Sequence, residues 1–151
     1  MMNIKTKFPP PLVTLVFGFL INYTKNIFPQ IGIVGRGVFG SIIIIFGMFI
    51  ILSAVILFKK YKTTITPLNP SNASKLIVIG VYKFSRNPMY LGLLLVLSGI
   101  STILNPIGGL LFVPIFILYL TYFQIIPEEN AMLDLFKDEF LEYKENVRRW
   151  I

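Results

Sequence analysis

The sequence predicts an all-α integral membrane protein, a single domain over residues 1–151 with four transmembrane helices and a C-terminal amphipathic helix on the cytoplasmic side. Apolar residues make up 55% of the chain and charged residues only 14%, whereas soluble domains carry about 25% charged residues. All seven acidic residues lie from Glu128 onward. Upstream of Glu128, three long runs carry no charge at all, and about 20 such residues suffice to span a bilayer as a helix.

The first two uncharged runs each predict one span. The run between Lys7 and Lys25 has 17 residues, with three prolines at 9–11. We expect its helix to begin at the last of these prolines and to cover about 11–28. The run between Arg36 and Lys59 has 22 residues and predicts a second span over 37–58. Glycines at 32, 35 and 37 are similar to a nucleotide-binding loop, but such a loop needs a βαβ unit around it. We therefore interpret them as part of the connection between two spans.

The third uncharged run, residues 87–127, is long enough for two spans. Its 41 residues would reach about 60 Å as a helix, about twice the thickness of a bilayer core. The sequence NPIGG at 105–109 is typical of a turn and divides the run into spans over 89–104 and 107–126. Pro114 is expected to kink the second of these.

The acidic tail predicts one amphipathic helix over 128–150. Its apolar side chains recur every three or four residues, which places them on one helical face: Met132, Phe136, Phe140, Tyr143, Val147 and Trp150. Glu128 and Glu129 occupy the first turn, where the helix dipole favours acids. We expect this helix to cap the protein's own cytoplasmic loop.

The positive charges predict the orientation in the membrane. Counting loops alternately, Lys and Arg number twelve on one side and two on the other. The richer side holds both termini and the segment 59–86, and it is expected to face the cytoplasm. The same scattered placement favours juxtamembrane charge over a nucleic-acid partner, which is not expected.

The residue types that are missing restrict the chemistry. The chain contains no Cys and no His, which excludes a thiol nucleophile, a Ser-His-Asp triad and a His-ligated zinc. No metal site is expected. Any reaction must rely on acids, tyrosines, amides or a bound cofactor.

Two sequence blocks carry a specific resemblance. Residues 76–92 read LIVIGVYKFSRNPMYLG, and residues 127–150 read PEENAMLDLFKDEFLEYKENVRRW. The first resembles the pattern L-V-x-x-G-x-Y-x-x-x-R-(H/N)-P-x-Y-x-G, and the second resembles the E-E … F-G-x-E-Y … R-W tail, of the isoprenylcysteine carboxyl methyltransferase and phospholipid methyltransferase superfamily. With the flanking residues 63–75 and 124–126, the blocks cover 57 of the 151 residues. They occur in the family's order, separated by one helical hairpin.

This resemblance implies S-adenosylmethionine as methyl donor, bound at the cytoplasmic face without a Rossmann domain. The catalytic positions that it implies are Glu128 and Gln124. Gln124 stands where carboxylate-methylating members have Arg, and Lys137 stands where Gly usually follows the tail Phe. Glu129 lies about 100° further round the helix and is expected to point elsewhere. The implied cofactor-binding positions are Ser74, Lys75, Leu76, Ile77, Tyr82, Asn87, Pro88, Met89, Tyr90 and Glu128.

The predicted function is therefore methyl transfer to a lipophilic acceptor at the membrane: an isoprenylcysteine-like compound, a phospholipid or another small lipophilic substrate. A sulfonium donor suits aromatic faces such as Tyr82 and Tyr90, and its transfer needs neither metal nor imidazole. Taken singly, each of the two tyrosines is more typical of an interfacial belt, and it is the joint order and spacing of the motif residues that favours a donor site. The alternative is a non-enzymatic membrane scaffold or partner subunit that retains the fold.

Overall fold

The computed structural model is all-helical over the residues that it describes, which are 8–29, 31–32, 34–61 and 75–151. Short 3₁₀ turns at Thr24–Asn26 and Gly80–Lys83 and a π-helical segment at Thr121–Ile125 accompany the α-helices. The α-helices are α1 (Pro10–Tyr23), α2 (Arg36–Tyr61), α3 (Pro88–Leu104), α4 (Pro106–Leu120) and α5 (Ile126–Asn146).

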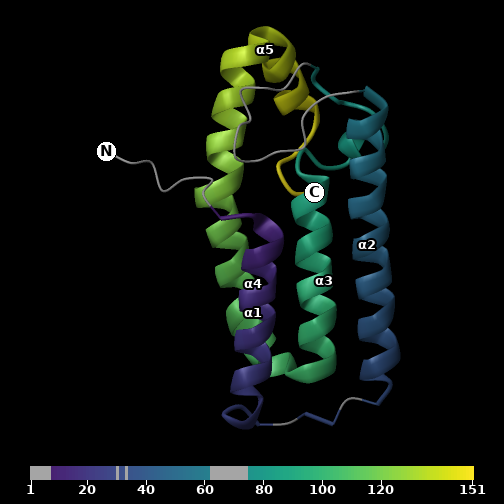
Figure 1. The fold of residues 1–151 in the computed structure, drawn as a ribbon, viewed down its shortest axis with the longest axis vertical. Helices are drawn as coiled ribbons and strands as arrows, with labels where there is room; N and C mark the ends of the chain where they lie inside the picture. The colour runs from purple at the N-terminus through teal and green to yellow at the C-terminus, as the bar shows by residue number, and fades with distance from the viewer. Residues whose placement is uncertain (1–7, 30, 33, 62–74) are drawn as a thin grey trace.

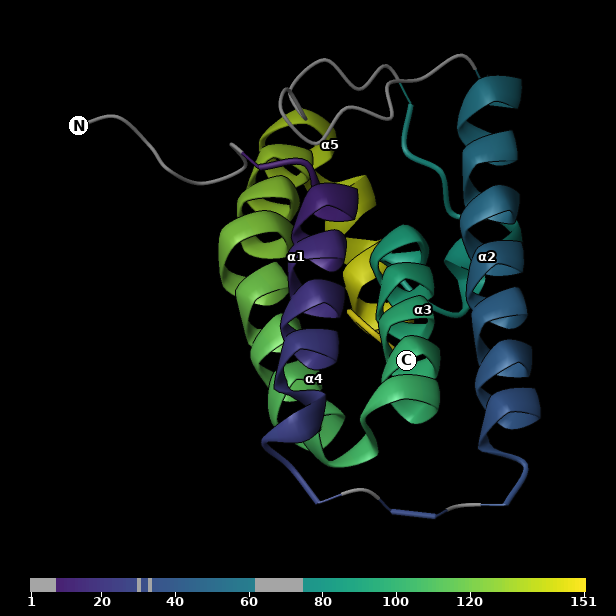
Figure 2. The ribbon, with the colours of Figure 1, turned by 60° about the horizontal axis from the view of Figure 1, so that its bottom comes forward.

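Helix α3 lies at the centre of the bundle. Helix α2 packs along one side of it, while α1 and α4 pack against the other side and against each other. Figure 2 shows α3 between α2 and the α1–α4 pair. The position of α2 therefore depends almost entirely on its contact with α3.

Two pairs of glycines allow α2 and α3 to approach closely. A Cβ atom on Gly40 would lie 2.8 Å from the carbonyl oxygen of Gly99, and one on Gly47 would lie 2.7 Å from that of Gly92. The two helices run antiparallel (Figure 1), so glycines seven residues apart on one helix meet glycines seven apart on the other. Close packing through small residues is typical of helices inside membranes.

The other side of α3 forms an apolar core with α1 and α4. Ile21, Leu97, Phe116 and Leu120 are fully buried there. Phe17 contacts Phe116 edge to face, with ring centroids 5.3 Å apart. This core holds α1, α3 and α4 together below the candidate site.

The turn between α3 and α4 forms where the sequence predicts it. Asn105 is buried, caps α4 by accepting from the Gly108 N–H at 2.9 Å, and donates to the Ile21 carbonyl of α1 at 3.1 Å. Pro106 follows at the first helical position, where its missing N–H costs nothing. Pro114 lies inside α4, and the helix continues on both sides of it.

The outer faces of the bundle are strongly apolar. On α2, the exposed side chains include Phe39, Ile42 and Phe49, and on α4 they include Leu110. Two helices of the described residues are long and apolar enough to cross a membrane: α2, and the continuous helix from Pro106 to Asn146. Helices α1 and α3 are shorter, with 14 and 17 residues, and four crossings stay a prediction.

The helix bounds follow the predicted spans closely except at two places. Helix α1 stops at Tyr23 rather than about 28, because the Thr24 hydroxyl bonds back to the Leu20 carbonyl and a 3₁₀ turn follows. The span expected over 107–126 does not end there: α4, the π-helical segment and α5 form one helix of 41 residues.

The single cap helix expected over 128–150 is wrong in two respects. Lys137 has φ 43° and ψ −114°, which breaks α5 and turns its last part back over the bundle (Figure 1). Helix α5 then ends at Asn146, and Val147 is extended. The break lets Met132 and Phe136 on one side of it, and Phe140 and Tyr143 on the other, pack into the same apolar cluster.

Candidate active site

A cavity of about 340 Å³ lies where the first turns of α1 and α3 meet α2 and α5. Its walls are mostly apolar, and its polar groups gather on the side of α3 and α5. The lining residues are Pro10, Pro11, Ile51, Val55, Phe58, Leu76, Ile77, Tyr82, Arg86, Asn87, Pro88, Met89, Tyr90, Leu93, Glu128, Glu129, Met132, Phe140 and Tyr143.

The segment before α3 brings Tyr82 to this cavity. Gly80 has φ 61°, and a Cβ atom there would lie 2.9 Å from a Leu57 methyl group, so the turn depends on glycine. The following 3₁₀ turn buries Tyr82, whose ring contacts Phe58 edge to face at 5.6 Å. The Tyr143 hydroxyl donates to the Tyr82 carbonyl at 2.7 Å and thereby ties this turn to α5.

The first turn of α3 forms the next wall. Asn87 precedes the helix and Pro88 occupies its first turn, a position that proline favours. Tyr90 follows on the buried side and donates a short hydrogen bond to Glu128. This bond joins α3 to the start of α5 directly across the cavity.

Glu128 is the carboxylate that faces the cavity without a cationic partner among the described residues. Burial raises its pKa to about 8; the hydrogen bond from Tyr90 opposes this shift, and the neighbouring charge of Glu129 adds to it. A positively charged ligand would reverse the shift, because an opposite charge favours the ionised carboxylate.

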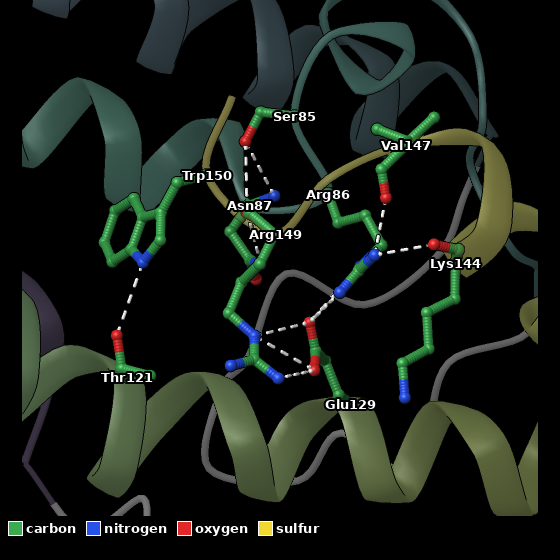
Figure 3. A network of polar contacts seen from close by, with 9 residues as sticks. All are labelled: Ser85, Arg86, Asn87, Thr121, Glu129, Lys144, Val147, Arg149 and Trp150. Atoms are coloured by element: carbon green, nitrogen blue, oxygen red, sulfur yellow. Dashed lines mark hydrogen bonds and ion pairs between the residues drawn. The ribbon is translucent and has the colours of Figure 1, made fainter.

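Glu129 points to a different environment. Its carboxylate accepts from Arg86 Nη2 at 3.0 Å and from Arg149 Nη2 at 2.7 Å (Figure 3). Burial alone would raise the pKa of Glu129, but the hydrogen bonds from Arg149 and Arg86 outweigh burial and lower it. Glu129 is thus a buried, ionised link between two arginines, which also borders the cavity.

Arg86 is held on every side. Besides Glu129, its guanidinium donates to the carbonyl oxygens of Lys144 and Val147 at the end of α5. Its side chain is only 7% exposed. Arg86 therefore fastens the segment before α3 to the tail and is not free to bind a ligand.

The structure brings eight of the predicted site residues to one cavity, and it separates the others. Lys75 is exposed and does not line the cavity, and Ser74 lies outside the described residues. Gln124 is buried below, in the π-helical segment, where its amide donates to the Phe8 carbonyl at 2.9 Å. The eight are Leu76, Ile77, Tyr82, Asn87, Pro88, Met89, Tyr90 and Glu128.

Several lining residues are not among the positions that the sequence predicts. Arg86 and Glu129 lie inside the quoted motifs, and Phe140 and Tyr143 lie on the apolar stripe of the tail, so signals for them existed. Pro10, Pro11, Ile51, Val55 and Leu93 belong to apolar runs in which no local pattern distinguishes a cavity wall from a lipid-facing position.

The arrangement suits a cationic ligand. The tyrosine rings and the ionised form of the Glu128 carboxyl group supply the negative side of the site, and most of the other walls are apolar. Among the described residues, no cluster of three or more acidic, His or Cys side chains could hold a metal ion.

Comparisons with known proteins show the family of this chain. Residues 36–139 match the model of the family described as phospholipid methyltransferase. An Arabidopsis thaliana protein-S-isoprenylcysteine O-methyltransferase A is 32% identical over 111 residues, which cover 72% of this chain and 55% of that relative. An uncharacterized protein of Haemophilus influenzae is 44% identical over 63 residues, 42% of this chain and all of that relative. No solved structure matches the chain at a significant level.

These findings place the chain among the membrane methyltransferases. It belongs to the phospholipid methyltransferase family. The matched region runs from the start of α2 into α5 and so contains most of the cavity wall.

Proposed function

We propose that this protein transfers a methyl group from S-adenosylmethionine to a lipophilic acceptor at the cytoplasmic face of a membrane. One observation carries the proposal. Two sequence blocks, separated by the α3–α4 hairpin, line the same cavity, where Tyr90 of the first bonds to Glu128 of the second.

The cavity suits the proposed donor in size and in charge. Its volume of about 340 Å³ falls in the range of about 300–1,000 Å³ that is typical of small-molecule sites. Glu128 supplies a carboxylate for a cationic group, and Tyr82 and Tyr90 supply aromatic faces. The donor would supply a methyl group bound to a positively charged sulfur. This sulfur is a good leaving group because it becomes a neutral thioether, so no metal is needed.

The chain's own residues hold the reactants and exclude water. Leu76, Ile77 and Met89 form apolar walls, and in such surroundings the attraction between Glu128 and a cation is stronger than in water. When two reactants are held near contact, a large part of the entropy cost of bringing them together no longer contributes to the barrier. The geometry thus favours catalysis by positioning.

The acceptor is proposed to enter sideways from the bilayer between α1 and α2. Pro10 and Pro11 of α1 and Ile51 and Val55 of α2 all line the cavity, yet these helices pack mainly against α3 rather than against each other.

Gln124 cannot replace an arginine that binds a carboxylate through two bonds, and its amide already bonds to Phe8. We expect weak or no turnover of a prenylcysteine free acid.

Donor binding is the decisive experiment. Protein purified in detergent is titrated calorimetrically with S-adenosylmethionine and with S-adenosylhomocysteine. Binding at micromolar concentrations, followed by transfer of a labelled methyl group to a membrane lipid extract, supports the enzyme. Absence of binding by the folded protein overturns the proposal and favours the scaffold alternative.

The orientation is proposed with both termini and the 59–86 segment in the cytoplasm. The end of α2, the start of α3 and the bend of α5 lie at one end of the bundle, and the α3–α4 turn lies at the other (Figure 1). Single cysteines placed at positions 30, 68, 107 and 151 can be labelled from either side. Labelling of position 68 from the outer face would contradict the orientation and the donor's proposed route.

A further inference from the structure

The residues that follow α5 run back to the start of α3. Val147 is extended, with φ −130° and ψ 130°, and residues 147–150, which we call the strap, reach the segment 85–87 (Figure 3). The strap does not line the cavity. It contacts three residues that do: Arg86, Asn87 and Glu129.

Main-chain atoms of the strap fix the segment that enters α3. The Arg86 N–H donates to the Arg148 carbonyl at 3.0 Å, and the Asn87 side-chain amide donates to the Arg149 carbonyl at 3.0 Å. The Ser85 hydroxyl contacts the same carbonyl at 3.4 Å and accepts from the Asn87 N–H at 3.1 Å. Asn87 thus lines the cavity, while its side-chain amide is held by a carbonyl group of the strap.

The Arg149 side chain fixes the other wall. Its guanidinium binds both carboxylate oxygens of Glu129, at 2.7 Å through Nη2 and at 3.1–3.2 Å through Nε. A two-point contact of this kind sets orientation as well as distance. Arg149 therefore connects Asn87 before α3 with Glu129 on α5.

Trp150 anchors the strap in the bundle. Its indole N–H donates to the Thr121 hydroxyl in the π-helical segment at 3.3 Å, and its ring packs against the apolar core that contains Tyr90 and Leu97. The strap is thereby fixed at both ends, by Arg86 at Val147 and by Thr121 at Trp150.

From these contacts we infer that Arg149 is a positioning residue, which sets the distance between the Asn87–Tyr90 wall and the Glu128–Glu129 wall and thereby the affinity for the methyl donor. This inference rests on the proposed function. Arg149 acts through Glu129 and Asn87 and does not contact the ligand.

The chain offers a matched control for the test. Arg148 is adjacent, carries the same charge and is exposed, and its side chain has no partner among the described residues. The variants are Arg149→Gln, Arg149→Lys and, as control, Arg148→Gln. Each is titrated calorimetrically with S-adenosylhomocysteine, and the dissociation constant and the number of binding sites per chain are both recorded.

We expect Arg149→Gln to raise the dissociation constant about tenfold or more, because a two-point charged contact is lost, with the number of sites unchanged. Arg149→Lys should recover part of the affinity, since it keeps the positive charge but not the two-point contact of the guanidinium. Arg148→Gln should match the parent within about twofold.

Other outcomes separate the two proposals. Fewer binding sites at an unchanged dissociation constant would mean that Arg149 only supports folding, and equal losses at Arg148 and Arg149 would mean a general charge effect; either overturns the inference. If Arg149→Gln does not fold, the comparison between Arg149→Lys and the parent decides in the same way. No binding by the parent protein contradicts the proposed function itself.

Discussion

The Tyr90 hydroxyl donates a hydrogen bond to the Glu128 carboxylate and so joins two segments that lie 38 positions apart in the sequence. The next residue along the helix, Glu129, binds two arginines instead. Two adjacent acids therefore differ: Glu128 lines the cavity with a carboxyl group that a cationic ligand would favour in its ionised form, and Glu129 holds the wall together.

Donor binding should depend on pH through Glu128. Its pKa of about 8 in the empty protein means that the carboxyl is largely protonated at pH 6 and ionised at pH 9. A cationic donor binds the ionised form, so affinity should rise by up to about tenfold per pH unit below pH 8 and level off above it. Calorimetry with S-adenosylmethionine at pH 6–9 measures this rise.

Glu128→Gln provides the control for that profile. It should weaken binding at pH 8 about 10- to 100-fold, because one charge-assisted hydrogen bond is lost, and it should remove the Glu128 part of the pH dependence. An unchanged profile in this variant would assign the titration to another group.

The same carboxyl should influence the stability of the empty protein. Its pKa is raised from 4.5 to about 8 on folding, so the folded state binds the proton more tightly than the unfolded state. Stability due to this group is therefore present below about pH 4.5 and is lost as pH rises toward 8. Melting curves should show Glu128→Gln to be more stable than the parent at pH 8 and similar to it at pH 5; a lower melting temperature at pH 8 would contradict this.

Glu129→Gln should destabilise the protein. It leaves Arg86, only 7% exposed, without its counter-charge, and breaking a buried ion pair on one side costs about 3 kcal/mol. The measurement is thermal unfolding in detergent, with Glu145→Gln as the exposed control. Equal melting temperatures for the two variants would show that the arginines find other partners.

Lys137→Gly should stabilise the protein by about 1 kcal/mol. Lys137 has φ 43°, and a residue with a Cβ pays about 1–3 kcal/mol in such a conformation, of which the greater chain entropy of glycine offsets about 0.4–1 kcal/mol. Lys137→Ala keeps the Cβ and should give no gain, and Glu142→Gly, in a regular part of α5, should lose stability. An equal gain for Lys137→Ala would point to the removal of the Lys137 charge instead.

Gly92→Ala should loosen the contact between α2 and α3. The added Cβ would lie 2.7 Å from the Gly47 carbonyl oxygen and 2.4 Å from an Ile51 side-chain carbon, and overpacking typically costs about 1–3 kcal/mol. Gly18→Ala is the matched control, because nothing lies within 4 Å of its Cβ position, and it should gain about 0.5–1 kcal/mol. Thermal unfolding measures the stability of both variants. Equal melting temperatures would mean that α2 and α3 can move apart to accommodate the added methyl group.

Local sequence signals predicted much of the fold. The Asn105-Pro106 turn and the bounds of α2 and α3 follow from residues that act on their own neighbours: a capping amide, a helix-starting proline and the ends of uncharged runs. The motif residues from Leu76 to Tyr90 and Glu128 likewise come together at one cavity.

What the sequence could not predict depends on packing between distant segments. This chain has no Gly or Pro next to Lys137, although the family pattern has Gly at its position. The strained conformation of Lys137 lets Phe136 and Phe140 contact the same cluster. The π-helical segment gives no sequence signal, yet it turns Gln124 toward Phe8 and Thr121 toward Trp150. Pro10 and Ile51 line the cavity because of how α1 and α2 pack against α3.

The strap has a consequence for the order of events during synthesis. Asn87 leaves the ribosome 62 residues before its partner Arg149, so the first turn of α3 is synthesised before the carbonyl groups that fix it exist. Contacts this distant in sequence form late in folding. A nascent chain can thus complete its helical hairpins early, but the ligand cavity reaches its final shape only after residues 147–150 have been added.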